Sequence, residues 1–160
     1  LRSFEGMVDC QMTATCKADS TMSVLLPSVN ASCYLSGKNM VLLDGETFTE
    51  ISKTLMFNNK KRNIIDSIAV DLAIHDNKIE VFPFLVEMYR YKVAVGGTHN
   101  LDMTFDYHLS VLKSPVPFKL GIDIKGNLDD FKFNIVKCKY KDFLKPAKQA
   151  ELDSTRRNVR

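Results

Sequence analysis

Three side chains on one predicted strand are of the types that act as acid, base and nucleophile. Asp106, His108 and Ser110 alternate with apolar residues, so they project from the same side of the strand. Their neighbouring Cα atoms would lie about 6.5–7 Å apart, whereas a catalytic triad needs each side chain within about 3 Å of the next and an oxyanion hole beside them. We therefore interpret these residues as a solvated polar face, and we predict no catalytic residue.

We predict no metal site at the other two histidines and no cofactor for the chain. His75 and His99 lie beside or inside predicted turns, with no second histidine or carboxylate at a convincing ligand spacing. The pair Gly96-Gly97 belongs to no phosphate-binding motif, and a turn accounts for it.

The four cysteines are Cys10, Cys16, Cys33 and Cys138, and no two of them have the CxxC spacing of a zinc or redox motif. We interpret them as small core residues. Cys10 and Cys16 would lie about 20 Å apart on one strand, which is too far for a disulfide. The sequence leaves open whether Cys33 meets one of them across a sheet.

The composition is that of a folded globular domain. The 160 residues are 45% hydrophobic and 26% charged, which argues against disorder. No stretch approaches the roughly 18 apolar residues that a membrane helix requires. The net charge of +3 is spread among mixed basic and acidic residues, so we expect no nucleic acid as a partner. Because the chain begins at Leu1 within a predicted strand, we expect it to be a piece of a larger protein.

Alternation of apolar and polar residues with a period of two runs through most of the chain and predicts β-strands. Short turns separate successive strands, among them Asp76-Asn77, Gly96-Gly97 and residues 114–117. Strands joined by short turns pair antiparallel, so the predicted fold is mainly β: a meander of about eight or nine amphipathic strands, curled or sandwich-like. It occupies a single domain over residues 1–145.

Two segments depart from this period. Between residues 47 and 55 apolar residues recur at steps of three and four, and Thr47 with Glu50 forms a capping box. This pattern predicts one short amphipathic helix over residues 45–57. Residues 146–160 lose apolar periodicity, and there we expect a polar C-terminal tail, either a frayed helix or a disordered segment.

The predicted strands share an apolar face, which must be covered by another part of the structure. A second sheet would close an ordinary sandwich. One short helix, however, cannot cover the whole meander, and the uncovered remainder would then form a groove for an apolar ligand. The alternation leaves open which face is concave. It predicts as groove residues Ile68, Val70, Leu72, Val93, Met103, Phe105, Tyr107, Leu120, Ile122 and Phe133.

Several segments resemble a known protein family. Residues 35–51 (LSGKNMVLLDGETFTEI) are similar to a glycine, strand, Asp-Gly and short-helix element in the C-terminal region of AsmA-like proteins. Residues 97–110, followed by 114–118, resemble the version of that region found in Bacteroidetes, and residues 121–128 resemble its closing strand. The resemblance covers residues 30–145 in the order and spacing of the family.

The resemblance implies a function as well as a fold. AsmA-like proteins are large envelope proteins of Gram-negative bacteria, anchored in the inner membrane by an N-terminal helix and extending through the periplasm. They belong to a bridge-like group whose long curled β-sheet forms an apolar groove, and they are implicated in phospholipid transport and outer-membrane integrity. The family has no catalytic residues to carry over.

The expected protein is therefore a non-catalytic periplasmic module, with the full-length protein anchored in the membrane upstream of this chain. Its expected partner is a phospholipid or another apolar ligand held in the groove. The alternative is a closed β-sandwich, a structural module that docks an envelope protein through an edge strand.

Overall fold

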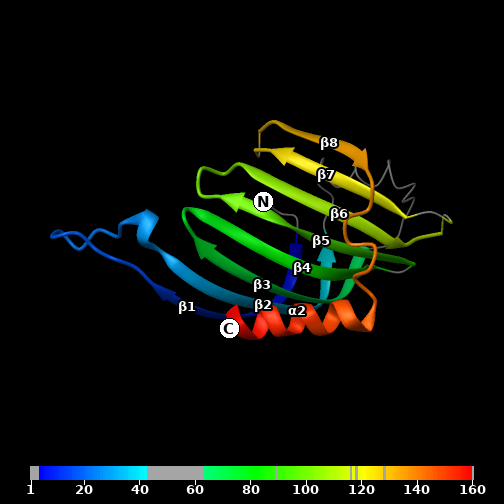
Figure 1. The fold of residues 1–160 in the computed structure, drawn as a ribbon, viewed down its shortest axis with the longest axis horizontal. Helices are drawn as coiled ribbons and strands as arrows, with labels where there is room; N and C mark the ends of the chain where they lie inside the picture. Colours follow the sequence, from blue (N-terminus) through cyan, green and yellow to red (C-terminus); the bar gives the residue numbers. More distant parts are fainter. Residues whose placement is uncertain are drawn as a thin grey trace.

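The computed structural model describes residues 4–42, 63–88, 90–115, 117, 119–127 and 129–159. Within them, eight strands form one antiparallel sheet in chain order (Figure 1). The strands are β1 (Phe4–Thr15), β2 (Asn30–Leu42), β3 (Asn63–His75), β4 (Lys78–Met88), β5 (Tyr91–Asn100), β6 (Phe105–Lys113), β7 (Leu120–Gly126) and β8 (Phe131–Val136). The predicted meander is confirmed, and the described strands form one open sheet instead of the two layers of a sandwich.

Two irregular features of the sheet lie where local sequence signals indicate them. Asp76 and Asn77 have positive φ angles of 49° and 61°, as a two-residue hairpin turn between β3 and β4 requires. Pro83 lies where the register between β4 and β5 shifts, because proline has no N–H to donate to the ladder.

The predicted turn at Gly96-Gly97 is wrong. Both glycines lie inside β5, and the chain turns after Asn100 instead. The Asp102 carboxylate fixes this turn, because it accepts hydrogen bonds from the backbone N–H of Thr104 at 2.9 Å and from its hydroxyl at 2.6 Å. Met103, one of the predicted groove residues, consequently lies in the turn, with a φ angle of 71°, and outside the paired strands.

Met22, Val24 and Leu26 alternate with polar or other residues, a pattern that predicts a strand, but they do not form one. β1 ends at Thr15, and residues 16–29 form the connection of a long hairpin, with a short 3-10 helix η1 (Leu26–Ser28) before β2. In this connection Ala18 and Val24 make a single isolated bridge.

The polar C-terminal segment folds as helix α2 (Pro146–Val159). Of the two alternatives expected for it, a helix or a disordered segment, the helix forms. Proline at the first position suits the start of a helix, where an N–H would have no partner within the helix. Leu152 attaches α2 to a buried cluster that contains Ala94, Leu112 and Phe143. The amphipathic helix predicted over residues 45–57 lies outside the described residues.

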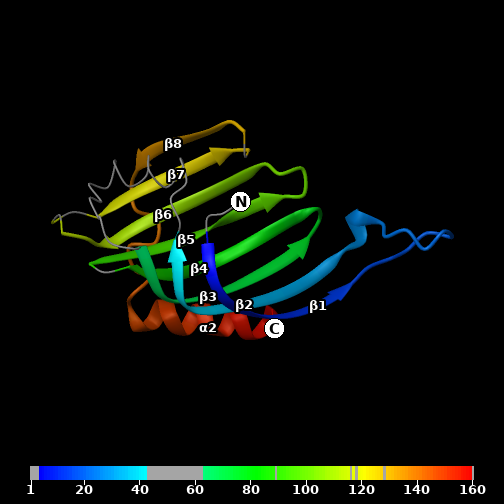
Figure 2. The same cartoon turned by 180° about the vertical axis from the view of Figure 1, so that it is seen from behind.

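The sheet curls, so its two faces differ. Figures 1 and 2 show α2 against one face, which we call the convex face, and the start of β1 and the end of β2 turned up over the other, the concave face. The core is divided accordingly. One buried cluster lies on the concave side around Val70, and the other lies on the convex side around Ala94.

Candidate functional site

The register places nine of the ten predicted groove residues on the concave face. Directly paired residues of antiparallel strands project from the same face, and such pairs extend from Leu35 opposite Val70 to Tyr107 opposite Ile124. The nine residues are Ile68, Val70, Leu72, Val93, Phe105, Tyr107, Leu120, Ile122 and Phe133. The apolar face is therefore continuous across the sheet.

The centre of the concave face is a packed core. Val70, Val81 and Phe84 form one buried cluster, and Tyr107 packs against it from β6. Ile122 has no exposed surface (0%). Val70 and Ile122 therefore stabilise the fold, and a ligand would contact the partly exposed residues around them.

The two rims of the concave face carry exposed apolar side chains. On β1, Val8 and Met12 lie opposite Gly37 and Cys33 and are exposed. On β8, Ile135 pairs with Ile122 but is 61% exposed. These three rim residues were not predicted, although a signal existed: the first and last strands of a meander are its edges, where a side chain has a neighbouring strand on one side only.

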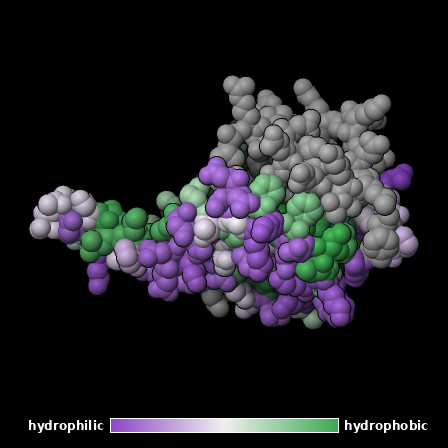
Figure 3. Space-filling model, turned by 90° about the horizontal axis from the view of Figure 1, so that it is seen from above, coloured by the Kyte–Doolittle hydropathy of each residue, from purple (hydrophilic) through white to green (hydrophobic). Residues whose placement is uncertain are grey.

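The connection between β1 and β2 projects from the sheet and carries an apolar patch behind a more polar tip (Figure 3). A cleft of about 560 Å³ separates Leu26 and Pro27 from the turns of the sheet at Asn77 and Leu101. The large hydrophobic residues exposed on the projection are Met22, Val24, Leu25 and Leu26. The projection therefore adds exposed apolar side chains to those of β1.

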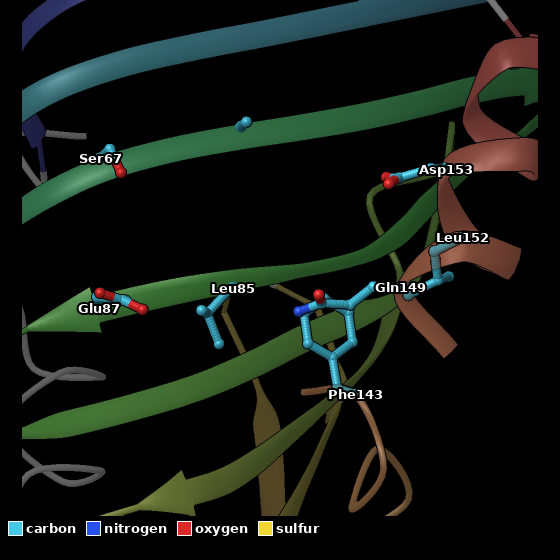
Figure 4. Close-up of a pocket in the computed structure, with 8 residues that line it drawn as sticks. Ser67, Leu85, Glu87, Phe143, Gln149, Leu152 and Asp153 are labelled. Carbon is cyan, nitrogen blue, oxygen red and sulfur yellow. The ribbon is translucent and has the colours of Figure 1, made fainter. Parts of the chain in front are cut away.

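The convex face has an open pocket of about 450 Å³ between the sheet and α2 (Figure 4). Leu85, Phe143 and Leu152 form its apolar wall. Its polar side chains lie at two separate ends, Ser67 and Glu87 at one, Gln149 and Asp153 at the other (Figure 4). Because these groups do not converge on one point, the pocket lacks the arrangement of a catalytic site.

A segment that we call the strap, residues 137–145, crosses the convex face and covers a hydrogen-bonded chain of Asp123, His108 and Ser110. His108 Nδ1 lies 2.5 Å from Asp123 Oδ1, and His108 Nε2 lies 2.9 Å from Ser110 Oγ. The register brings them together, since His108 pairs with Asp123 and Ser110 follows on the same face. The order is that of a catalytic triad.

The strap uses the same atoms that a triad would use. His108 Nε2 accepts the backbone N–H of Lys139 at 3.1 Å, and Ser110 Oγ accepts that of Tyr140 at 3.0 Å. Because Nε2 accepts a hydrogen bond, the neutral ring carries its proton on Nδ1 and donates it to Asp123. These contacts attach the strap to β6 and β7.

The predicted solvated polar face is therefore wrong at two of its three residues. His108 is 3% exposed and Ser110 is 0% exposed, because the strap lies over them. Asp106, the third, is half exposed and forms an ion pair with Lys125 at 2.7 Å. A substrate has no access to Ser110 in this fold, so the Asp123, His108 and Ser110 chain acts here as the anchor of the strap.

Two glycines make room for the strap. A β-carbon at Gly96 would lie 2.7 Å from the hydroxyl oxygen of Tyr140, and one at Gly121 would lie 2.5 Å from the carbonyl oxygen of Lys137. A larger residue at Gly121 would press on the backbone of the strap and push it away from the sheet, whereas one at Gly96 would displace the Tyr140 side chain. Gly96 pairs with His108 and Gly121 pairs with Ser110, so both lie beside the anchor.

Acid is expected to weaken the anchor. Partial burial alone would raise the pKa of Asp123, but the hydrogen bonds from His108 and Lys139 outweigh it and leave this pKa below the ordinary value of 3.8. A lowered pKa contributes stability above the unfolded value, and that contribution is lost as the pH falls through the folded value. The free energy of unfolding, measured between pH 6 and pH 2, should therefore fall more steeply below about pH 4 in the wild type than in Asp123→Asn. An equal fall in the two proteins would contradict this prediction.

Among the described residues, no group of three or more His, Cys, Asp or Glu side chains is placed to hold a metal ion. No described helix has both the length and the apolar character needed to cross a bilayer. Comparison with protein-family models, with curated proteins and with solved structures finds no match for this chain. The structure therefore defines the fold alone: an open, curled antiparallel sheet with an apolar concave face.

Proposed function

We propose that this chain is a non-catalytic lipid-binding module, the C-terminal part of an AsmA-like periplasmic protein that guides phospholipid between the membranes of the envelope. The observation that carries the proposal is the continuous apolar concave face, which is exposed at both rims at Met12 and Ile135. Each CH₂ group of an acyl chain that leaves water against such a surface contributes about 0.8 kcal/mol, so binding needs no catalytic group.

The buried centre and the exposed rims have different parts in this proposal. The core around Phe84 holds the curl in shape, and the rim side chains supply the surface that an acyl chain covers. The motifs that resemble AsmA-like proteins at residues 35–51 and 97–110 support the choice of phospholipid as the ligand.

A second candidate function, docking of an envelope protein, is favoured by a different observation. In the described sheet, β1 and β8 each pair with a strand on one side only. The free edge of such a strand can add a strand from a partner through backbone hydrogen bonds. Docking at an edge would not depend on the rim side chains of the concave face.

Met12→Asp is expected to weaken phospholipid binding about 10- to 150-fold, because burial of one methionine side chain contributes roughly 1.5–3 kcal/mol. Met12 lies on the concave face and is 63% exposed, so the fold should tolerate the change. The measurement is a titration of the delipidated protein with a fluorescent phospholipid, supported by native mass spectrometry of protein purified from bacteria.

Met7→Asp is the matched control for this experiment. Met7 is on the same strand and is 87% exposed, but it lies opposite Lys38 and therefore projects from the other face. The Met7→Asp protein should bind phospholipid as tightly as the wild type does. Equal loss in both variants, or no binding by the wild type, would argue against the concave face as the lipid site. Edge docking would then become the leading candidate.

A further inference from the structure

Cys10 and Cys33 meet on the concave face, which the sequence had left open. They lie on the neighbouring strands β1 and β2, where Cys10 pairs with Leu35 and Met12 pairs with Cys33, so the two cysteines are diagonal neighbours. Their Sγ atoms are 3.5 Å apart, in contact with each other. The twist of a sheet shortens one of the two diagonals between paired strands, which accounts for this approach.

The other two cysteines are placed differently. Cys16 follows Thr15, the last paired residue of β1, which lies opposite Asn30, so it is displaced along the hairpin from Cys33. Cys138 packs with the cluster of Ala94 and Leu112 on the convex side of the sheet. The contact between Cys10 and Cys33 is therefore specific to that pair.

We propose that Cys10 and Cys33 are the site of an intramolecular disulfide that fastens edge strand β1 to β2. This proposal stands apart from lipid binding, since it concerns the covalent state of the sheet. The bond would close the loop that contains the whole projecting hairpin, and it would fix the register of β1 against β2.

The geometry suits this reaction. A disulfide needs the sulfur atoms about 2.0 Å apart, so the two would approach by about 1.5 Å from their present 3.5 Å. β1 pairs only with β2 among the described strands, so it can shift towards β2 without breaking another ladder. Cys33 is buried, but Cys10 and Cys16 are exposed, so the interpretation of the cysteines as core residues is wrong for these two. Because Cys10 is exposed and Cys33 is buried, an external oxidant reaches Cys10 first.

The oxidant is an external disulfide bond, either that of an oxidised dithiol oxidoreductase or that of oxidised glutathione. The exposed Cys10 thiolate attacks one sulfur of that disulfide, forming a mixed disulfide and releasing one thiol. Cys33 then loses its proton and attacks Cys10 Sγ, which releases the second thiol. In total, two cysteines are oxidised and one external disulfide is reduced. Burial, with the hydrogen bond to Cys10, raises the pKa of Cys33 to about 11, so Cys10 is the cysteine that reacts first.

The test exposes the folded chain to a buffer of oxidised glutathione, alkylates the remaining thiols and measures the intact mass. The wild type, which has four cysteines, should retain two alkylated thiols, and peptide mapping should recover Cys10 linked to Cys33. The melting temperature of the oxidised protein should fall when a reductant is added, because the closed loop restricts the unfolded chain.

Cys16→Ser and Cys138→Ser are the matched variants and should still form the bond. Cys10→Ser should lose it and keep three alkylatable thiols; because Cys10 is exposed, this variant should fold. Four alkylated thiols in the wild type, glutathione retained on Cys10, or a linkage to Cys16 or Cys138 would each overturn the proposal. None of these results bears on phospholipid binding.

Discussion

His108→Ala is expected to lower the free energy of unfolding by about 3 kcal/mol. The substitution removes the His108 donor to Asp123 Oδ1, which then keeps only Lys139 Nζ at 3.3 Å. It also removes the acceptor of the Lys139 N–H, while the strap still covers that group. Buried polar groups without partners are costly, so the strap should detach more often than in the wild type. Chemical denaturation measures the stability loss. Hydrogen exchange at the amides of Lys139 and Tyr140 measures the detachment, since both amides bind the anchor.

The control for this variant is Asp106→Asn, on the same strand and the same face. Asp106 is half exposed and pairs with the exposed Lys125, so its replacement should change stability by less than about 1 kcal/mol. A loss in Asp106→Asn as large as in His108→Ala would mean that the whole face, and not the buried anchor, stabilises the sheet. Unchanged exchange at Lys139 in His108→Ala would refute the role of the anchor.

The strands could be predicted from the sequence because their signal is local. Alternation with a period of two requires only that one face be apolar, and the Asp76-Asn77 turn requires only residues that tolerate positive φ. The error at Gly96-Gly97 arose from competition between two turn signals. Asp102 and Thr104 form side-chain hydrogen bonds that fix the turn four residues later. Gly96 instead leaves room for the Tyr140 hydroxyl over the sheet, and Gly97 lies close against Asp106 and Tyr107 of β6.

Membership of the concave face could also be predicted, since it follows from alternation and register. The division of that face into core and rim could not, because burial depends on how far a strand lies from the edge of the sheet. Ile122 and Ile135 have the same side chain and face the same way, yet one is in β7 between two strands and the other is on edge strand β8.

The sequence pattern does not reveal the anchor, because its parts come from three distant segments. Asp106, His108 and Ser110 alternate along one strand, but the aspartate that binds His108 is Asp123 on β7. A hairpin centred on residues 114–117 places His108 opposite Asp123, so the register alone could have identified the acid. The burial of the pair could not be inferred, since it depends on the strap, where no periodic pattern marks a contact with the sheet.

Ile122→Asp is expected to unfold the protein, with a loss of more than about 4 kcal/mol of stability. Ile122 is 0% exposed between β6 and β8, and a carboxylate there would be buried without a partner. Unfolding curves and circular dichroism measure the loss. The result identifies the centre of the concave face as core, and it means that a failure of this variant to bind lipid would say nothing about the ligand.

Ile135→Asp is the variant that separates the two roles of the apolar face. It introduces the same charge on the same face, directly opposite Ile122, but at a site that is 61% exposed. Its stability should change by less than about 1 kcal/mol. If an acyl chain covers the β8 rim, phospholipid affinity should fall as it does in Met12→Asp. A folded Ile135→Asp protein with unchanged affinity would confine the ligand to the β1 rim, and an Ile122→Asp protein that stays fully folded would show that the centre of the face is open to water.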